Sequence, residues 1–493
     1  MSRSLKNRTA HSLKWNIVDR VASQCLYAVT GIVLARVLSE EDFGLVGAML
    51  IFQAFASLMV DSGFSYALLQ RKKPSRLDYS TVLWFNMGMA VLLYAVLFVA
   101  APLIAKCFQN DARIIPLSRV QFLVIILNAS AIVHTNRLMK GMQMRMVAVS
   151  NTIGLVLGGV TGIVLALTGF GAWAIVWQAI VLAACKTMIL WTSSSWRPLA
   201  RFSLPVLRSY FGIGLKMMFT SFLNTLFLNI YGFFIGNRVG LVALGYYTQS
   251  DKWSKMGITS VSQVLTSTFL PALSAVQDVP ERFAAVVSKT NRFTAYILFP
   301  FLLGLAAVAS PMFHTLFGTK WDPSIILFQL LLFRGVFTVL VSLYNNYLLA
   351  LGHSGTILKL EVLRDTVALI ALVVSLPFIN LTQPDNPVWG LEILLYGQLA
   401  ASVITWVATL WETVRLTKVP LMSFMRDMSP YLAQTLLIIP VMLAVGALVP
   451  QSALKLVVEL VVALGLYIGG NRFFGSTLQR EVFAYFRYGK VPQ

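Results

Sequence analysis

The chain has 493 residues, of which 57% are hydrophobic and 12% are charged, and its formal net charge is +20. Soluble domains carry roughly 25% charged residues, and a soluble protein of this composition would expose far too much apolar surface. Composition therefore excludes an ordinary soluble domain and indicates a polytopic membrane protein. The positive charge suits loops that face anionic lipid or an anionic cargo, and nothing resembles a basic nucleic-acid module with interleaved aromatic residues.

A membrane-spanning helix needs about 20 mostly apolar residues. The sequence predicts about 14 of them and hence an all-α integral membrane fold. The eighth is the weakest, because DKWSK lies inside it. The predicted spans cover residues 14–37, 43–69, 78–105, 114–136, 147–168, 170–193, 209–235, 242–272, 293–317, 323–350, 357–379, 388–414, 428–449 and 452–474.

Lys and Arg residues indicate the orientation. They concentrate in the loops that follow even-numbered spans, such as RKK at 71–73, and at both termini. The first loop on the other side, SEED at 39–42, is acidic. Basic loops stay on the cytoplasmic side, so both termini are predicted to be cytoplasmic, which agrees with an even number of spans. The N-terminus lacks the compact apolar region of a removable signal peptide, so the first span is expected to direct insertion.

The two parts of the chain resemble each other, which indicates parallel repeats of six spans each. The matches keep the same order along both parts and pair Lys14 with Lys216, Arg36 with Arg238, Gly44 with Gly245, Pro102 with Pro311, Gln121 with Gln329 and Asn136 with Asn346. We expect an N-terminal lobe at 1–195, a C-terminal lobe at 196–420, and two appended spans with a tail at 421–493. Two lobes around a central cavity are typical of a rocking transporter; a single stable bundle is the alternative.

Residues 35–86 read ARVLSEEDFGLVGAMLIFQAFASLMVDSGFSYALLQRKKPSRLDYSTVLWFN. The elements ARxL, DFG, DxGF, ALLQRK and a following aromatic-Asn pair resemble the start of Wzx-type polysaccharide transport proteins. These flippases belong to the multidrug/oligosaccharidyl-lipid/polysaccharide export superfamily. The resemblance implies a V-shaped fold with two lobes. It also implies movement of undecaprenyl-diphosphate-linked oligosaccharide across a bacterial inner membrane, for lipopolysaccharide or exopolysaccharide synthesis.

Charged and polar residues inside the spans provide candidate sites. A diphosphate is anionic, so its path through the membrane should carry cations, with Arg suited to bidentate contact and Lys acting as a point charge. Arg20 and Arg334 lie on polar stripes of the first and tenth spans. The candidates for a cavity that binds diphosphate and sugar are Arg20, Lys216, Asn224, Lys252, Lys255 and Arg334. Some have a simpler role: Lys255 could only neutralise Asp251 one turn earlier, and Lys186, near a span end, is expected to snorkel to the interface.

Release of the cargo requires a state in which these cations are paired differently. Candidates for this pairing, or for coupling to H⁺ or Na⁺, are Asp19, Asp61, Glu361 and Asp365. The Glu361–Arg364 pair has the spacing of a structural ion pair. Asp61 has two interpretations: it pairs with Arg20 in a cavity, or the Asp-Ser-Gly sequence breaks the second span and caps a new turn beginning near Phe64. The sequence favours the second.

Missing motifs exclude several classes. No GxxxxGK[ST], HExxH or GxSxG occurs, and the three cysteines and four histidines show no metal-ligand spacing, so no metal, cofactor or catalytic site is predicted. A membrane-embedded transferase is disfavoured because no predicted loop is long enough for sugar chemistry. A peptidoglycan-precursor flippase and a cation-coupled multidrug antiporter stay as alternatives. The expected partners are the lipid-linked oligosaccharide, membrane lipids and the polymerase and chain-length machinery; the chain is expected to be a monomer and no nucleic acid is expected.

Overall fold

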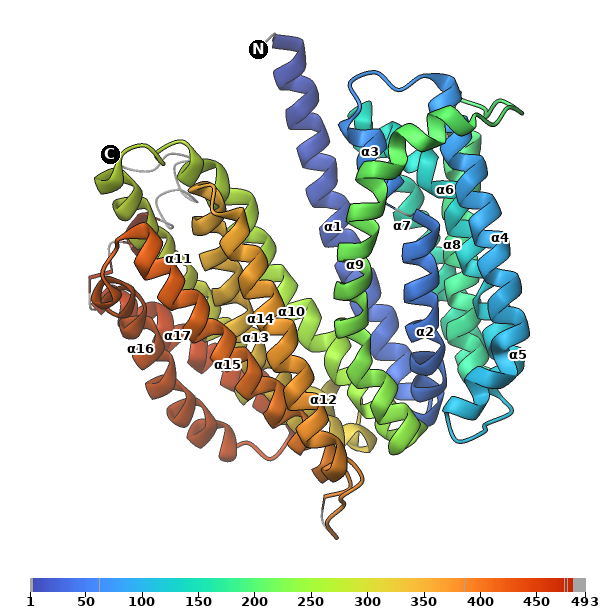
Figure 1. The fold of residues 1–493 in the computed structure, drawn as a ribbon. Coiled ribbons are helices and arrows are strands. Elements are labelled where there is room, and N and C mark those ends of the chain that lie inside the picture. Colours follow the sequence, from blue (N-terminus) through green and yellow to red (C-terminus); the bar gives the residue numbers. More distant parts are fainter. Residues whose placement is uncertain (1–2, 62, 385, 474, 477, 482–493) are drawn as a thin grey trace. The chain divides into compact units, whose positions relative to one another are not determined.

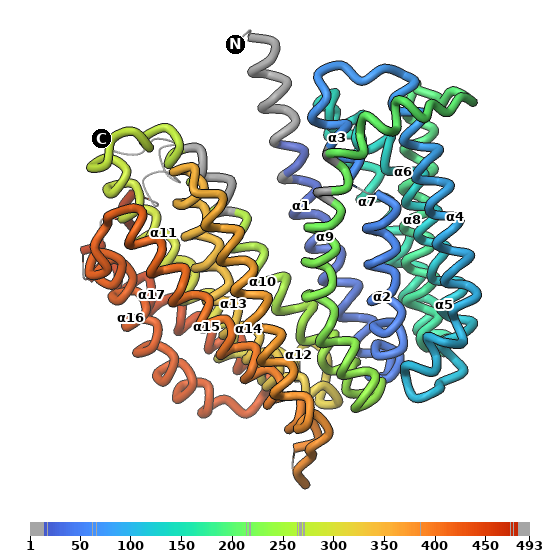
Figure 2. The backbone as a smooth tube through the Cα atoms, viewed as in Figure 1, coloured from blue at the N-terminus to red at the C-terminus, as the bar shows by residue number. Residues whose placement is uncertain are grey.

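A computed structural model of the protein describes residues 3–61, 63–384, 386–473, 475–476 and 478–481 (Figures 1 and 2). Apart from one isolated bridge between Gln383 and Asn386, the regular structure of these residues is helical, which confirms the all-α prediction. The helices are α1 (Arg3–Val37), α2 (Glu40–Asp61), α3 (Phe64–Gln70), α4 (Arg76–Cys107), α5 (Ile114–Gln121), α6 (Leu123–Lys140), α7 (Met144–Leu167), α8 (Ala172–Ser193), α9 (Leu204–Arg238), α10 (Leu241–Ser274), α11 (Pro280–Ala307), α12 (Ala309–Leu316), η1 (Thr319–Trp321), α13 (Asp322–Ala350), α14 (Ser354–Ser375), η2 (Leu376–Phe378), α15 (Trp389–Thr417), α16 (Leu421–Ala447) and α17 (Ser452–Phe473).

Eleven helical segments of the described chain are long and apolar enough to cross a membrane, or twelve if the bent pair α11 and α12 counts as one span. The two halves of that pair meet at an angle of 62°. The other long helices, α10 and α14, carry the charged groups Asp251-Lys252 and Arg364-Asp365. The chain is therefore a multi-pass membrane protein, while the count of fourteen spans stays a prediction.

The outer faces of these helices are strongly apolar. Side chains such as Val99, Leu437 and Leu448 are 77%, 73% and 83% exposed. Exposed apolar area on this scale is unfavourable in water and expected of helices that face lipid tails.

The chain forms two compact units, Met1–Thr248 and Gln249–Gln493. In the first unit, α7 packs on both α1 and α8, and α9 packs on α2, α3 and α4. Glycines of α7 make the close approach to α8 possible, because a Cβ at Gly158 would lie 2.7 Å from the carbonyl oxygen of Gln178, and one at Gly154 2.9 Å from that of Leu182. The division after residue 195 concerns the repeat copies and stays a prediction; the compact unit extends to Thr248 because α9 packs within it.

The second unit is built around α13. This helix packs against α11, α14 and α15, and its residues Leu331, Val339 and Tyr347 are fully buried. The last two helices, α16 and α17, pack against each other, and α16 also packs on α11. A polar side chain on α13 that faces α14 and α15 is thus enclosed by protein, and a cavity of the second unit lies at this position.

Candidate functional site

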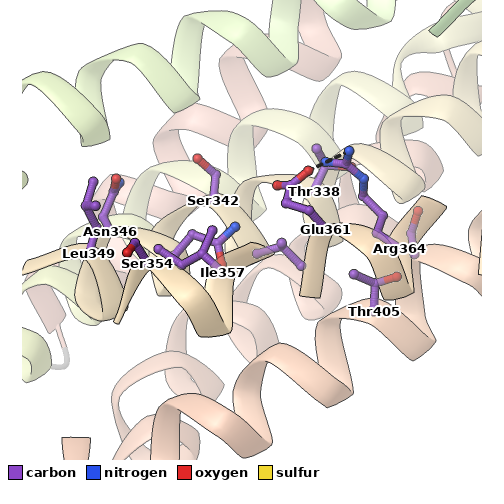
Figure 3. Close-up of a pocket in the computed structure, with 12 residues that line it drawn as sticks. Thr338, Ser342, Asn346, Leu349, Ser354, Ile357, Glu361, Arg364 and Thr405 are labelled. Carbon is purple, nitrogen blue, oxygen red and sulfur yellow. Dashed lines mark ion pairs between the residues drawn. The ribbon is translucent and has the colours of Figure 1, made fainter. Parts of the chain in front are cut away.

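A polar cavity of about 480 Å³ lies among α13, α14 and α15 in the second unit (Figure 3). Thr338, Ser342 and Asn345 line it from α13, as expected for the polar stripe that the sequence predicts on this helix. The remaining polar lining comes from Asn346, Ser354, Glu361, Arg364, Ser402 and Thr405. Oδ1 of Asn345 is buried and accepts no hydrogen bond from the described residues. Hydroxyl and amide groups at this density suit a ligand that offers many hydroxyl groups.

An ion-pair cluster on α14 forms one wall of this cavity. Nη2 of Arg364 lies 2.6 Å from Oε2 of Glu361 and 2.9 Å from Oδ1 of Asp365, and Figure 3 shows the Glu361 and Arg364 side chains reaching toward each other. The spacing of Glu361 and Arg364 predicted such a pair. The single guanidinium is shared by two carboxylates, so the cluster carries a formal net charge of −1. This wall can therefore attract a cation as well as accept hydrogen bonds from hydroxyl groups.

Arg334 lies on the same helix as the polar stripe but bonds across to α15. Its Nη1 donates to Oε1 of Gln398 over 2.5 Å. Nε of Arg334 and Nε2 of Gln398 are both buried and donate to no acceptor among the described residues. Two unused donors side by side make this pair a candidate for binding an anionic oxygen, if the helices open enough to admit one.

The cations of α10 have separate environments. Lys255 forms an ion pair of 2.6 Å with Asp251, which is the neutralising contact that their spacing predicts. Lys252 lies beside the ring of Trp253, with Nζ 5.5 Å from the ring centroid, and its side chain is exposed. Among the described residues Lys252 has no carboxylate within ion-pair distance, so its charge is available to a ligand.

A second polar cluster joins α1 and α7 in the first unit. Nδ2 of Asn151 donates to Oδ1 of Asp19 over 3.1 Å and to Oγ of Ser23 over 2.9 Å. Lys186, on α8, is half-buried and close enough to Asp19 for the two charges to attract each other. The snorkelling of Lys186 to the interface stays a prediction. No pattern in the sequence pointed to Asn151 as a member of this cluster.

Asp61 ends α2, and α3 begins three residues later. Gly63 takes a left-handed conformation with φ of 69°, which favours glycine. Oδ1 of Asp61 accepts hydrogen bonds from the backbone N–H (3.3 Å) and the hydroxyl (2.5 Å) of Ser65. Asn136, on α6, then donates to that hydroxyl over 2.6 Å. The predicted break is confirmed. The N-cap of α3 is Gly63 and not Asp61, which lies two residues before the N-cap position and instead accepts from the first turn. The alternative pairing with Arg20 does not occur, because Asp61 faces the start of α3.

Two of the remaining candidate site residues, Arg20 and Asn224, belong neither to the polar cavity of α13 to α15 nor to the cluster of Asp19 and Asn151. Arg20 is exposed on α1 and forms no ion pair within the described part of the chain. Asn224 is exposed on α9. The side chain of Lys216 lies outside the described residues. Arg20 and Asn224 belong to the first unit, and the other cavity candidates with described side chains belong to the second.

A family model described as polysaccharide biosynthesis protein matches residues 33–326, which is more than half of the chain. The chain belongs to this family. The match includes the ARxL-to-aromatic-Asn segment and extends through α12 into the start of α13.

Curated relatives agree with this assignment. The succinoglycan biosynthesis transport protein ExoT of Rhizobium meliloti is 25% identical over 459 residues, covering 92% of this chain and 90% of the relative. The lipopolysaccharide biosynthesis protein WzxC of Escherichia coli is 23% identical and covers 83% and 85% of the two chains. The teichuronic acid biosynthesis protein TuaB of Bacillus subtilis is 22% identical, over 71% and 73%. The names of these relatives describe biosynthesis or transport of succinoglycan, lipopolysaccharide and teichuronic acid.

Two solved structures have a fold similar to that of this chain. The lipid II flippase MurJ superposes with a TM-score of 0.69 at 14% identity, covering 93% of this chain and 99% of MurJ. A MATE-family multidrug transporter of the MOP superfamily superposes with a TM-score of 0.60 at 16% identity, over 80% and 96%. This chain therefore has the transporter fold that both proteins share.

Proposed function

We propose that the protein is a flippase that moves a diphosphate-linked lipid oligosaccharide from the cytoplasmic to the periplasmic leaflet of a bacterial inner membrane by alternating access. The observation that carries the proposal is the family match over residues 33–326, together with relatives named for surface-polysaccharide transport and synthesis. The MurJ and MATE alternatives have support from fold alone, since their identities are 14% and 16%.

In this proposal the polar cavity of the second unit receives the sugar portion of the cargo. Its lining of Thr, Ser and Asn side chains can donate and accept hydrogen bonds with sugar hydroxyls without imposing one charge sign. The proposed diphosphate ligands are Arg20, Lys216, Lys252 and Arg334, with Lys255 and Asn224 in supporting roles. Support comes from the unpaired charge of Lys252 and from the unused donor of Arg334.

We further propose that flipping is coupled to H⁺ or Na⁺ through carboxylates inside the helices. Asp19 has a polar cage of Ser23 and Asn151, and Glu361 and Asp365 share one guanidinium, so each site has a carboxylate whose partner can change. The proposed orientation places both termini in the cytoplasm, and the proposed partners are the polymerase and chain-length proteins that take up the flipped cargo.

Reconstitution tests the flippase proposal directly. The full chain is placed in proteoliposomes with a fluorescent oligosaccharide on undecaprenyl diphosphate, and a membrane-impermeant quencher reports the leaflet of each molecule. We expect the protected fraction to change with time in the presence of the protein and not with an unrelated membrane protein of similar size. If the protein flips lipid II and does not flip the oligosaccharide lipid, the peptidoglycan-precursor alternative replaces the proposal.

A further inference from the structure

A second cavity, of about 440 Å³, lies in the first unit at the basic ends of α4, α6 and α8. We call it the basic pocket. Lys73, Arg137 and Lys140 line it, together with the hydroxyl groups of Tyr79, Ser193, Ser194 and Ser195. No carboxylate is part of its lining among the residues that the structure describes. The polar cavity of α13 to α15 is in the other unit, so the basic pocket is a separate site.

A carboxylate next to this lining in the sequence is already neutralised. Asp78, next to Tyr79, lies 3.2 Å from Nη1 of Arg71 and accepts a hydrogen bond from the backbone N–H of Ser75. The positive charge of Lys73 and Arg137 therefore has no compensating charge in the lining. Lys73 is exposed at the rim, and Arg137 is half-buried with Nη1 donating to Oγ of Ser194 over 3.3 Å.

Helix C-termini normally repel anions because their last carbonyl groups are unsatisfied. Here those groups have donors. Arg197 donates to the carbonyl oxygens of Trp191, Ser194 and Trp196 at the end of α8. Backbone N–H groups of Gly141 and Gln143 donate to the carbonyls of Arg137 and Leu138 at the end of α6. The pocket thus keeps its cations while the negative ends of both helices are largely satisfied.

Aromatic residues indicate the depth of the pocket in the membrane. Tyr79 lines it, Trp191 lies on the last turn of α8, and Trp84 is 44% exposed with its indole N–H bonded to the carbonyl of Leu199. Trp and Tyr concentrate at the level of lipid headgroups. Met139 and Met188 are 40% and 62% exposed on α6 and α8, within two turns of the lining residues Lys140 and Ser193, and would meet acyl chains.

We infer that the basic pocket binds the phosphate headgroup of an anionic membrane phospholipid. The lipid phosphate would lie against Lys73 and Arg137, the serine hydroxyls would donate to its oxygens, and the acyl chains would follow the exposed apolar faces of α6 and α8. Basic pockets between membrane helices bind such anionic headgroups, and each Lys or Arg strengthens the attraction. Lys140 has a structural role instead, because its Nζ donates to the carbonyls of Leu68 (3.0 Å) and Leu69 (2.9 Å) at the end of α3.

The test is a lipid titration of the full chain, delipidated in a neutral detergent and followed by native mass spectrometry. The probes are phosphatidylglycerol, phosphatidylcholine and inorganic phosphate. We expect a preference for phosphatidylglycerol over phosphatidylcholine. Lys73→Gln should weaken phosphatidylglycerol binding by about fivefold, which corresponds to the loss of one cation at a membrane surface, and Lys73→Gln with Arg137→Gln should weaken it further.

The matched control is Lys72→Gln with Arg208→Gln, which removes two exposed cations of the same unit that do not line the pocket. It should bind phosphatidylglycerol as the wild type does. Should Arg137→Gln impair folding, Lys73→Gln decides alone, since Lys73 is exposed. Unchanged binding in Lys73→Gln overturns the inference. Displacement of phosphatidylglycerol by inorganic phosphate at millimolar concentration also overturns it, because the site would then bind free anions.

Discussion

Gly44 and Gly245, which match in the two predicted repeats, lie against each other where the start of α2 crosses the start of α10. A Cβ at Gly44 would collide with the carbonyl oxygen of Leu241, and one at Gly245 with that of Glu40. A Cβ at Gly47, one turn further along α2, would lie 2.7 Å from Oγ1 of Thr248. Small residues thus meet at one crossing, where the two backbones touch.

Gly44→Ala or Gly245→Ala should therefore lower stability by about 1–3 kcal/mol, the usual range for an added methyl group in a packed site, because a backbone carbonyl cannot move aside. The measurement is the thermal unfolding midpoint of the detergent-solubilised protein. Gly88→Ala is the control, since a Cβ there meets nothing within 4 Å and Ala is the better helix former. A midpoint for Gly44→Ala equal to that of Gly88→Ala would contradict the close crossing.

Substitutions of Asp61 distinguish a structural role of its carboxylate from a functional role in ion coupling. Asp61→Ala should cost about 1 kcal/mol, because α3 loses the acceptor that caps its first turn. Asp61→Asn should keep most of the stability and most of the flipping activity, since an amide oxygen can also accept from Ser65. Thermal unfolding and the leaflet assay measure the two effects. Normal stability with abolished flipping in Asp61→Asn would instead assign Asp61 to ion coupling.

The break at Asp61 shows what could be predicted from the sequence. Asp, Ser and Gly favour caps and turns by local backbone chemistry, so the end of α2 and the start of α3 follow from neighbouring residues alone. The all-α membrane fold could be predicted from hydropathy, and the Glu361–Arg364 pair from its i,i+3 spacing. Both signals are also local in the sequence. Lys186 was different: its position beside Gly154 and its attraction to Asp19 depend on the packing of three helices. Gln398 as the partner of Arg334 also depends on long-range packing, which no sequence spacing encodes.

The cluster on α14 should respond unequally to loss of its members. Arg364→Gln leaves Glu361 and Asp365 facing each other without their shared cation, so flipping should fall more than in Glu361→Gln, in which Arg364 keeps Asp365. Stability should change by less than about 1 kcal/mol in both, because all three side chains are partly exposed. Initial flipping rates at matched protein content measure the difference. Equal rates in Arg364→Gln and wild type would remove this wall from the proposed cargo site.

The loop between α4 and α5 gives a dependence of stability on pH. Arg113 donates hydrogen bonds to Asp111 from its side chain and its backbone N–H, and its side chain also bonds Glu41. The hydrogen bonds and positive charge of Arg113 lower the pKa of the Asp111 carboxyl from 3.8. A carboxyl whose pKa is lower in the folded state stabilises that state fully at pH values above its unfolded pKa. This stabilisation is lost as the pH falls through its folded pKa. Unfolding midpoints of wild type and Asp111→Asn should differ by a constant amount from pH 7 to pH 5 and converge below pH 3.8. A difference that grows on acidification would contradict this assignment.

The cluster of Asp19, Asn151 and Lys186 predicts which carboxylate couples flipping to an ion gradient. Lys186 and Asp19 attract each other, so an incoming H⁺ or Na⁺ would compete with an internal cation for the same carboxylate. Asp19→Asn should abolish the response of flipping to an imposed gradient and leave gradient-independent exchange. Lys186→Gln should respond at a lower ion concentration than the wild type, because the Lys186 ammonium no longer competes for Asp19. Proteoliposomes with defined H⁺ and Na⁺ gradients measure both, and Lys14→Gln, an exposed cation on α1, is the control. A full response in Asp19→Asn would move the coupling role to Glu361 and Asp365, the carboxylates that share Arg364.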